Sequence, residues 1–359
     1  MGKKVFIIAE AGVNHNGSLN RALEMVDVAA NAKANAIKFQ TFKTEELVAK
    51  HAPKAEYQMR NDQVDESQFD MLKKLELNEE DHFKIIEHCN QRNIKFLSTP
   101  FDSKSLHFLI NRLNLEVIKI PSGEITNGPF LLEVARAAKK IILSTGMSNL
   151  GEIEKALKVI AFGFLNKSGE IPSHSELQNI LSKEEAILLL KRRVVILHAT
   201  TEYPAPVTEI NLSAMNTIFT AFKLPIGYSD HSLGIHIPIA AVAMGASVIE
   251  KHFTLDKELP GPDHKASLNP IELETMVRLI RETEMAVGNG IKQPVPSEIK
   301  NMEIARKSLI ASKTIKKGEK FSIDNLTSKR PGSGISPMLY WQMLGKEATF
   351  DFDEGDLIR

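Results

Sequence analysis

The chain has 359 residues, of which 43% are hydrophobic and 25% are charged, a balance typical of a folded globular protein. Lysine plus arginine and aspartate plus glutamate both number 45, so the net charge is zero and the basic excess of a general nucleic-acid binder is absent. The single cysteine excludes a disulfide within the chain, and no stretch approaches the ~20 apolar residues of a membrane span or resembles a secretion signal. We therefore expect a cytoplasmic protein that binds neither nucleic acid nor membrane.

Short apolar runs recur along most of the chain, and each ends in a polar residue. Eight such runs are expected to be strands: 5–11, 36–42, 95–101, 117–122, 141–145, 194–200, 225–229 and 247–254. Continuous apolar strands separated by helices are typical of a parallel sheet that is covered on both faces.

Amphipathic stretches between these runs predict helices. In the first, Ala22, Val26 and Ala29 share one face, and Ser18 is a suitable N-cap. The predicted helices are 19–34, 81–93, 103–112, 130–139, 210–222, 234–245 and 270–287. Repeated strand–helix units predict an α/β fold of the TIM (β/α)8-barrel type. A doubly wound open sheet is the alternative, although the glycine fingerprint of a Rossmann fold does not follow the first strand.

The pattern changes near residue 288. Pro294 and Pro296 lie in a segment that suits neither helix nor sheet, so we expect a linker over residues 289–302. Residues 1–288 would then form the barrel, and 303–359 a small second domain too short for a substantial core of its own. Within the barrel, residues 44–78 and 162–191 are longer insertions. The first is polar, and its residues 52–58 are expected to form a loop over the mouth. The second is expected to hold a loop and an extra helix.

Polar side chains gather at the predicted strand ends, which in a TIM barrel converge on one face. Lys38 and Lys119 lie inside apolar runs, where a buried lysine is costly without a partner. With Ser122, Ser144 and Ser229 they are candidates for a cradle that binds a phosphate and a carboxylate. The simpler interpretation is that every strand becomes polar before its loop.

Two histidines follow the seventh and eighth strands, which are neighbours in a closed barrel. His231 and His252 are candidates for binding a divalent metal, with positions left for water and substrate. The alternative is a pair of hydrogen-bonded core histidines. Glu10, on the adjacent first strand, is a candidate base or water-orienting group. Asp263 lies in a proline-rich loop that either holds its carboxylate over the site or is an ordinary turn.

Ordered motifs throughout the chain resemble the sialic acid synthase family, which includes bacterial N-acetylneuraminate and N,N'-diacetyllegionaminate synthases. In the barrel they are IAEAGVNHNG (8–17), KFQT (38–41), STPF (98–101), KIPSGE (119–124), LSTGM (143–147), TEYP (201–204), GYSDH (227–231), EKHFTLDK (250–257) and GPDH (261–264). ARKS (305–308) and KRPGSGI (329–335) resemble the antifreeze-like SAF domain, a β-clip type fold.

This resemblance implies a role for each matching residue. His231 and His252 would bind a divalent metal, most often Mn2+ with Mg2+ or Co2+ as substitutes, and Glu10 would join them in catalysis. The implied phosphoenolpyruvate contacts are Lys38, Thr99, Lys119, Ser122, Ser144 and Ser229. The implied sugar contacts are Gln40, Glu124, Tyr203, Asp263 and Arg330. Thr201 departs from relatives that have asparagine there, so no contact is assigned to it.

The resemblance also implies an assembly. In the family, the SAF domain reaches across a domain-swapped homodimer and closes the partner's barrel. Arg330 would then enter the neighbouring active site and bind the acceptor sugar. Without a partner, the same residue would be an ordinary solvated arginine.

The expected reaction joins phosphoenolpyruvate, water and an N-acetylated mannosamine-type aldehyde sugar, with release of phosphate by metal-assisted C–O cleavage. The acceptor would be N-acetylmannosamine or 2,4-diacetamido-2,4,6-trideoxymannose, giving N-acetylneuraminate or N,N'-diacetyllegionaminate for capsule or lipopolysaccharide. Residues 10–17 and 261–268 resemble legionaminate synthases slightly more, and this resemblance favours the second acceptor. One alternative is another phosphoenolpyruvate-utilising or metal-dependent aldol-type barrel enzyme, such as a pseudaminate synthase. A non-catalytic carbohydrate- or ice-binding protein is the other, and it leaves the barrel lysines and histidines unexplained.

Overall fold

A computed structural model describes residues 4–56, 58–59, 66–167 and 169–359. The chain divides into two compact units, the first ending at Asn289 and the second comprising Gly290–Arg359. Within these described ranges, no helix is both long enough and apolar enough to cross a membrane.

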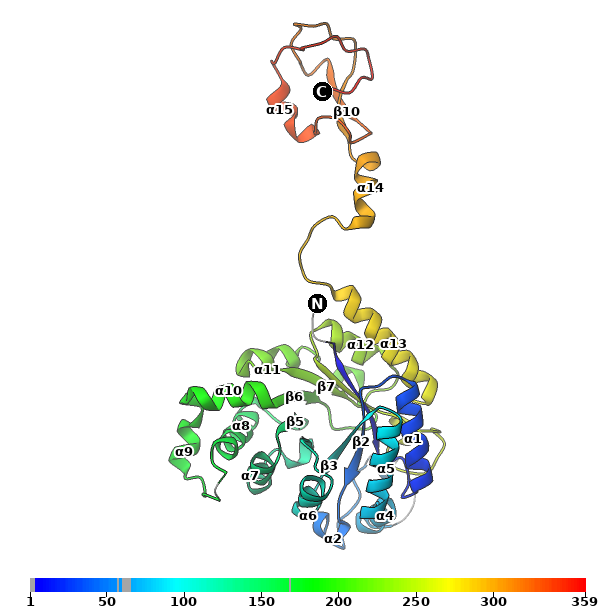
Figure 1. Ribbon diagram of the computed structural model, residues 1–359, viewed down its shortest axis with the longest axis vertical. Coiled ribbons are helices and arrows are strands. Elements are labelled where there is room, and N and C mark those ends of the chain that lie inside the picture. The colour runs from blue at the N-terminus through cyan, green and yellow to red at the C-terminus, as the bar shows by residue number, and fades with distance from the viewer. Residues whose placement is uncertain (1–3, 57, 60–65, 168) are drawn as a thin grey trace. The chain divides into compact units, whose positions relative to one another are not determined.

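The first unit contains eight parallel strands surrounded by helices (Figure 1). The strands are β1 (Phe6–Gly12), β2 (Ala36–Thr41), β3 (Lys95–Pro100), β4 (Val117–Ile120), β5 (Lys140–Ser144), β6 (Val194–Ala199), β7 (Ile226–Asp230) and β8 (Val248–His252). They are hydrogen-bonded in the order β3-β2-β1-β8-β7-β6-β5-β4, and β4 also packs against β3. The result is a near-closed barrel, so the predicted fold is confirmed and the open doubly wound alternative is wrong.

The helices of this unit lie on the outside of the strands (Figure 1). They are α1 (Leu19–Asn31), α5 (Glu79–Gln91), α6 (Ser103–His107) with the π-helical turn η1 (Phe108–Arg112), α7 (Gly128–Ala137), α8 (Leu150–Leu165), α11 (Ala214–Phe222), α12 (His236–Ala243) and α13 (Pro270–Val287). Short 3-10 turns are η2 (Ser122–Glu124), η3 (Ile180–Ser182), η4 (Val207–Glu209) and η5 (His264–Ala266). The Ser18 side chain caps α1 as expected, by accepting from the backbone N–H of Arg21.

Helix α8 was not among the predicted helices, although the sequence carries its start signal. The Asn149 side chain accepts from the backbone of Glu152, whose carboxylate accepts in turn from the backbone of Asn149. This reciprocal capping box satisfies two of the N–H groups that the first turn leaves without helical partners.

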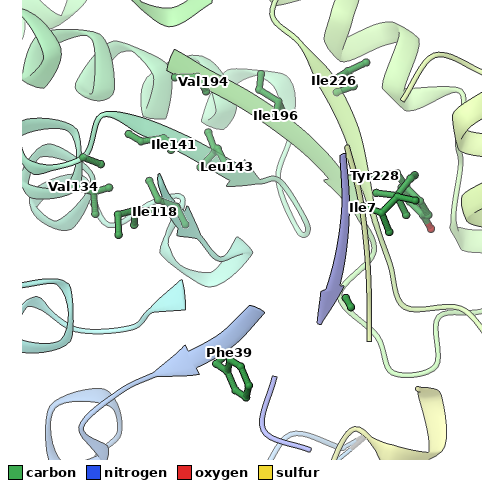
Figure 2. Packing of buried hydrophobic residues seen from close by; sticks show 14 of the residues in the cluster. Ile7, Phe39, Ile118, Val134, Ile141, Leu143, Val194, Ile196, Ile226 and Tyr228 are labelled. Atoms are coloured by element: carbon green, nitrogen blue, oxygen red, sulfur yellow. The ribbon is translucent and has the colours of Figure 1, made fainter. Parts of the chain in front are cut away.

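The strands bury two separate apolar layers, since successive side chains point to opposite faces. The larger cluster lies between the strands and the helices, and Figure 2 shows members of it that include Ile118, Ile141 and Ile196. The smaller cluster fills the inside of the barrel with Ile8, Ala36, Leu97, Ile142, Leu197 and Val248. Two residues further along, on the same face, five of these strands carry polar or charged side chains. These are Glu10, Lys38, Thr99, Ser144 and Glu250. The interior therefore changes from apolar to polar toward the C-terminal ends of the strands.

Both insertions contain helices. The first holds α2 (Thr44–Leu47) and α4 (Gln68–Leu75), which lie before and after the expected loop at 52–58; its residues 57 and 60–65 lie outside the described ranges. Met71 and Leu75 of α4 join Val13 and Phe42 in a small apolar cluster. The polar composition of the segment does not predict this cluster. The second insertion holds α9 (His174–Asn179) and α10 (Glu184–Arg193), with residue 168 outside the description.

The second unit is built on the antiparallel pair β9 (Ser308–Ala311) and β10 (Leu326–Lys329). Its core includes Leu309, Ile315, Phe321 and Phe352. The turn η6 (Pro337–Leu339) and the short helix α15 (Tyr340–Met343) follow. Helix α14 (Pro296–Ala305) occupies part of the segment expected to be an irregular linker. Pro296 is its first residue, a position where the missing N–H breaks no helical hydrogen bond, so this proline begins a helix rather than preventing one.

Candidate active site

A cavity of about 440 Å³ opens at the C-terminal ends of the barrel strands. Twelve of the predicted site residues line it: Glu10, Lys38, Gln40, Thr99, Lys119, Ser122, Ser144, Tyr203, Ser229, His231, His252 and Asp263. They come from all eight strands or from the loops that follow them. The fold thus brings together side chains that are up to 253 positions apart in the sequence, from Glu10 to Asp263.

Buried charges of both signs meet in this cavity. The Lys38 ammonium lies 2.6 Å from the Glu10 carboxylate and 3.6 Å from that of Glu250, and it donates to the Thr99 hydroxyl at 2.8 Å. The Lys119 ammonium lies 3.0 Å from Glu250 Oε1, which also accepts from the Ser229 hydroxyl at 2.9 Å. The two lysines therefore have the partners that their burial requires.

Glu250 was missed among the candidate residues. Its carboxylate connects both lysines and a serine, and it lines the cavity. The sequence does indicate Glu250 as a site residue, because a glutamate inside the apolar run 247–254 needs a partner as much as a lysine in such a run does.

The two carboxylates of the cluster differ in protonation. Burial raises the pKa of Glu10 to about 7, although the positive charge of Lys38 opposes this shift. Burial also acts to raise the pKa of Glu250, but Lys119 and Lys38 outweigh it and hold that pKa below its usual range. Burial lowers the pKa of Lys119. Glu250 is therefore an anion at neutral pH, whereas Glu10 can gain or lose a proton there.

The two predicted metal-binding histidines lie together. The ring centroids of His231 and His252 are 5.6 Å apart, and the Tyr203 ring lies 4.1 Å from that of His231. His231 Nδ1 is 2.6 Å from the Thr200 carbonyl oxygen, which can only accept, so Nδ1 carries the hydrogen and Nε2 keeps a lone pair. Burial lowers the pKa of His231 to about 4 and that of His252 well below its usual value. Both rings are therefore neutral, as a metal ligand must be.

The arrangement fits a metal held by two imidazoles. His252 Nδ1 is buried without a hydrogen-bond partner, and the Asp263 carboxylate lies 3.8 Å from it. Burial raises the pKa of Asp263 to about 7. Among the residues that the structure describes, no group of three or more His, Cys, Asp and Glu could hold a metal ion. An ion at His231 and His252 would therefore take its other ligands from water or substrate, as in open catalytic sites.

Hydroxyl groups of Ser122, Ser144 and Thr201 also line the cavity. The Gly146 N–H donates to Ser122 Oγ at 2.9 Å. The hydroxyl oxygens of Ser144 and Thr201 are buried without partners. A side chain at Gly146 would not fit, because its Cβ would lie 2.2 Å from Thr201 Oγ1 and 2.8 Å from Ser122 Oγ. Unsatisfied buried hydroxyl groups in the same cavity as Lys119 are suited to binding an anion.

Two predicted sugar-binding residues are not among those that line this cavity. Glu124 lies in η2, and its carboxylate accepts from the Asn127 amide at 2.7 Å. Arg330 belongs to the second unit, where its Nε donates to the Ala305 carbonyl at 3.0 Å. Contact between either residue and an acceptor sugar stays a prediction.

Comparison with known proteins agrees with the resemblance seen in the motifs. The NeuB family model matches residues 25–292, and the SAF domain model matches residues 306–359. The chain is 52% identical to the N,N'-diacetyllegionaminic acid synthase of Campylobacter jejuni subsp. jejuni serotype O:2, over 99% of each chain. It is 43% identical to the enzyme of the same name from Legionella pneumophila subsp. pneumophila, over 98% of this chain and 92% of the relative.

A solved structure is also similar. It is the N-acetylneuraminic acid synthetase of Leptospira borgpetersenii serovar Hardjo-bovis in complex with citrate, 35% identical, with a TM-score of 0.67 over 84% of this chain and 91% of that one. Two Campylobacter jejuni proteins named pseudaminic acid synthase are less similar, at 34% and 35% identity. The chain therefore belongs to the NeuB family, and its barrel is followed by a SAF domain.

Proposed function

We propose that the chain condenses phosphoenolpyruvate with 2,4-diacetamido-2,4,6-trideoxymannose and water, giving N,N'-diacetyllegionaminate and phosphate. The observation that carries the proposal is the meeting of Lys38 and Lys119 with His231 and His252 in one cavity. The choice of acceptor rests on the names of the two relatives that are 52% and 43% identical, whereas the pseudaminate alternative has support only at 34–35% identity.

Lys38 and Lys119 would bind the phosphate and carboxylate of phosphoenolpyruvate and offset the negative charge of that substrate. The hydroxyl groups of Thr99, Ser122, Ser144 and Ser229 lie in the same cavity and would hydrogen-bond the same anion. Fixing the donor in one orientation converts a bimolecular attack into a positioned one. Because Glu250 already holds Lys119 and Ser229, little reorganisation would be needed when the donor arrives.

The two imidazoles would hold the divalent ion, which we propose to be Mn2+, with Mg2+ or Co2+ as substitutes. Such an ion would act as a Lewis acid that polarises the acceptor aldehyde. Tyr203, packed against His231, and Asp263, close to His252, would contact the sugar around its aldehyde. Gln40 lines the same cavity and would add an amide contact.

Glu10 would act as the general base toward the attacking water. In the proposed reaction the enol carbon of phosphoenolpyruvate attacks the aldehyde carbon, positive charge develops at C2, and water adds there. Glu10 would accept a proton from that water, and a pKa of about 7 lets it do so and release the proton at neutral pH. Phosphate then leaves by cleavage of the C2–O bond, so the products balance one donor, one acceptor and one water.

We further propose that the SAF domain acts in a domain-swapped homodimer, in which Arg330 of one chain reaches the acceptor in the other barrel. The match of residues 306–359 to the SAF domain model supports this proposal, because in the family that domain completes the partner's site. The enzyme would work in the cytoplasm on the path to a surface polysaccharide.

Phosphate release from phosphoenolpyruvate tests the proposal. The protein is stripped of metal with a chelator, reloaded with Mn2+, and assayed with 2,4-diacetamido-2,4,6-trideoxymannose, with N-acetylmannosamine and without acceptor. We expect release that needs both metal and acceptor and is faster with the first sugar. Equal release without any acceptor, or no release with either sugar, would contradict the proposed function.

A further inference from the structure

The cavity has an apolar part that the chemistry described so far does not use. Six side chains from the ends of β2 and β3 and from the first insertion form it, and we call this set the apolar wall: Phe42, Leu47, Met71, Leu72, Leu75 and Phe101. All six line the same cavity as the lysines and histidines. The residues proposed to hold the donor and the metal are polar, so the wall is left for the other occupant of the cavity, the acceptor.

Contacts within the wall and beside it hold it in place. The rings of Phe42 and Phe101 pack edge to face with centroids 6.4 Å apart. The Glu76 carboxylate, just after α4, accepts from the Lys43 ammonium at 3.0 Å and from the Thr44 backbone N–H at 3.3 Å. It therefore ties the end of α4 to the start of α2. A preformed wall loses little conformational entropy on binding and can discriminate between ligands.

We propose that the apolar wall determines acceptor specificity by receiving the C6 methyl group of a 6-deoxy sugar. The inference rests on the proposed function, since it assigns a role within the same site. None of the six side chains can form a hydrogen bond, so a C6 methyl group would gain from burial against them. Gln58 and Gln68 of the same insertion also line the cavity, and the Gln68 amide donates to Gln58 Oε1 at 3.2 Å. A C6 hydroxyl group in the same place would lose its hydrogen bonds to water without replacement. Discrimination of this kind is on the order of ten- to a hundredfold in kcat/KM.

Leu72 and Leu47 are the best positions to test, because both line the cavity and both are only partly buried, so that polar substitution is compatible with folding. Leu72→Gln keeps the approximate length of the side chain and adds an amide to the wall. Leu72→Met is the matched control, since it changes the shape but keeps the apolar character. Leu47→Gln repeats the test from α2 if Leu72→Gln does not fold.

The experiment compares two acceptors that differ only at C6: 2,4-diacetamido-2,4,6-trideoxymannose and its 6-hydroxy counterpart. The wild type should prefer the 6-deoxy sugar on the order of ten- to a hundredfold in kcat/KM. Leu72→Gln should reduce that ratio about tenfold while leaving the KM for phosphoenolpyruvate unchanged, and Leu72→Met should keep the wild-type ratio. An unchanged ratio in both folded glutamine variants would overturn the inference but not the proposed function. Absence of turnover of either sugar by the wild type would overturn the proposed function, and this inference with it.

Discussion

Lys251 and Asp230 form a fully buried ion pair, with 2.5 Å between Lys251 Nζ and Asp230 Oδ2. The two residues are register partners on β8 and β7, and each immediately precedes one of the candidate metal ligands, His252 and His231. Asp230 also accepts from the hydroxyl groups of Tyr228 and Ser232. The pair therefore joins β7 and β8 immediately before the two histidines.

Replacing Lys251 by methionine should destabilise the protein and weaken metal binding. The substitution leaves Asp230 as an unpaired buried charge, and breaking such a pair costs about 3–5 kcal/mol. Urea unfolding measures the stability, and calorimetric titration with Mn2+ measures the affinity of the folded protein. Asp230→Asn combined with Lys251→Met should recover part of the stability. Unchanged Mn2+ affinity in the folded single variant would show that the pair does not position the imidazoles.

Replacing Gly146 by alanine should weaken binding of phosphoenolpyruvate. The new Cβ would meet the hydroxyl oxygens of Thr201 and Ser122 at 2.2 and 2.8 Å, so the hydroxyl-lined part of the cavity must shift. We expect the KM for phosphoenolpyruvate to rise at least about tenfold, since small misplacements of binding groups have large kinetic effects. Gly128→Ala is the control, because its Cβ would meet no atom within 4 Å. Equal KM values for the two variants would argue against a donor site at Gly146.

Replacing Glu250 by glutamine should make donor binding more sensitive to pH. Burial lowers the pKa of Lys119, and the charge of Glu250 is the main effect that opposes this. Without that charge Lys119 should lose its proton at lower pH, and kcat/KM for phosphoenolpyruvate should fall on the order of ten- to a hundredfold. The pH profile of kcat/KM is the measurement, with Glu258→Gln, at an exposed position, as the control. If the Glu250→Gln profile has the same alkaline limb as the wild type, the assigned role of Glu250 is wrong.

His15 should make stability depend on pH. The ring is buried, and burial lowers its pKa from 6.5 to about 3. Between these values the unfolded chain binds more protons than the folded one, so the free energy of unfolding falls as the pH is lowered from about 6.5 toward 3. By pH 5 this residue should account for roughly 2 kcal/mol of the loss.

The check is a comparison of urea unfolding at pH 7 and pH 5 for the wild type, His15→Gln and His174→Gln. His15→Gln should lose less stability between the two pH values than the wild type, whereas the variant at the exposed His174 should behave like the wild type. Identical pH dependence in all three proteins would mean that His15 does not stay neutral when folded.

The barrel and most of its cavity could be predicted from sequence because both depend on the apolar strands: the runs predict the barrel, and the charges inside them predict the cavity. Parallel strands buried on both faces read as continuous apolar runs, so a charge such as Lys38 or Lys119 within a run is conspicuous. The alternation of side chains then directs such a charge to the inside of the barrel. Glu250 also lies in such a run and is predictable for the same reason, since a buried carboxylate needs a partner as much as a buried lysine does.

Other features depend on contacts that local pattern does not reveal. The apolar wall includes Met71 and Leu75, which belong to the short helix α4 in a segment whose composition is polar. The burial of these two side chains against Phe42 stabilises that helix, and local sequence does not reveal the contact. Helix α14 begins at a proline that, read without its neighbours, indicates an irregular linker. The proposed metal site could be predicted only as two histidines, since no group of three or more His, Cys, Asp and Glu in the described part of the chain could hold an ion.

Diffraction from crystals grown with Mn2+ and phosphoenolpyruvate tests the central claim most directly. We expect an anomalous peak for manganese within bonding distance, about 2.1 Å, of one nitrogen each of His231 and His252. Density for phosphoenolpyruvate should lie against Lys38 and Lys119 in the same cavity. A manganese peak that contacts neither imidazole, or a donor bound away from both lysines, would contradict the account.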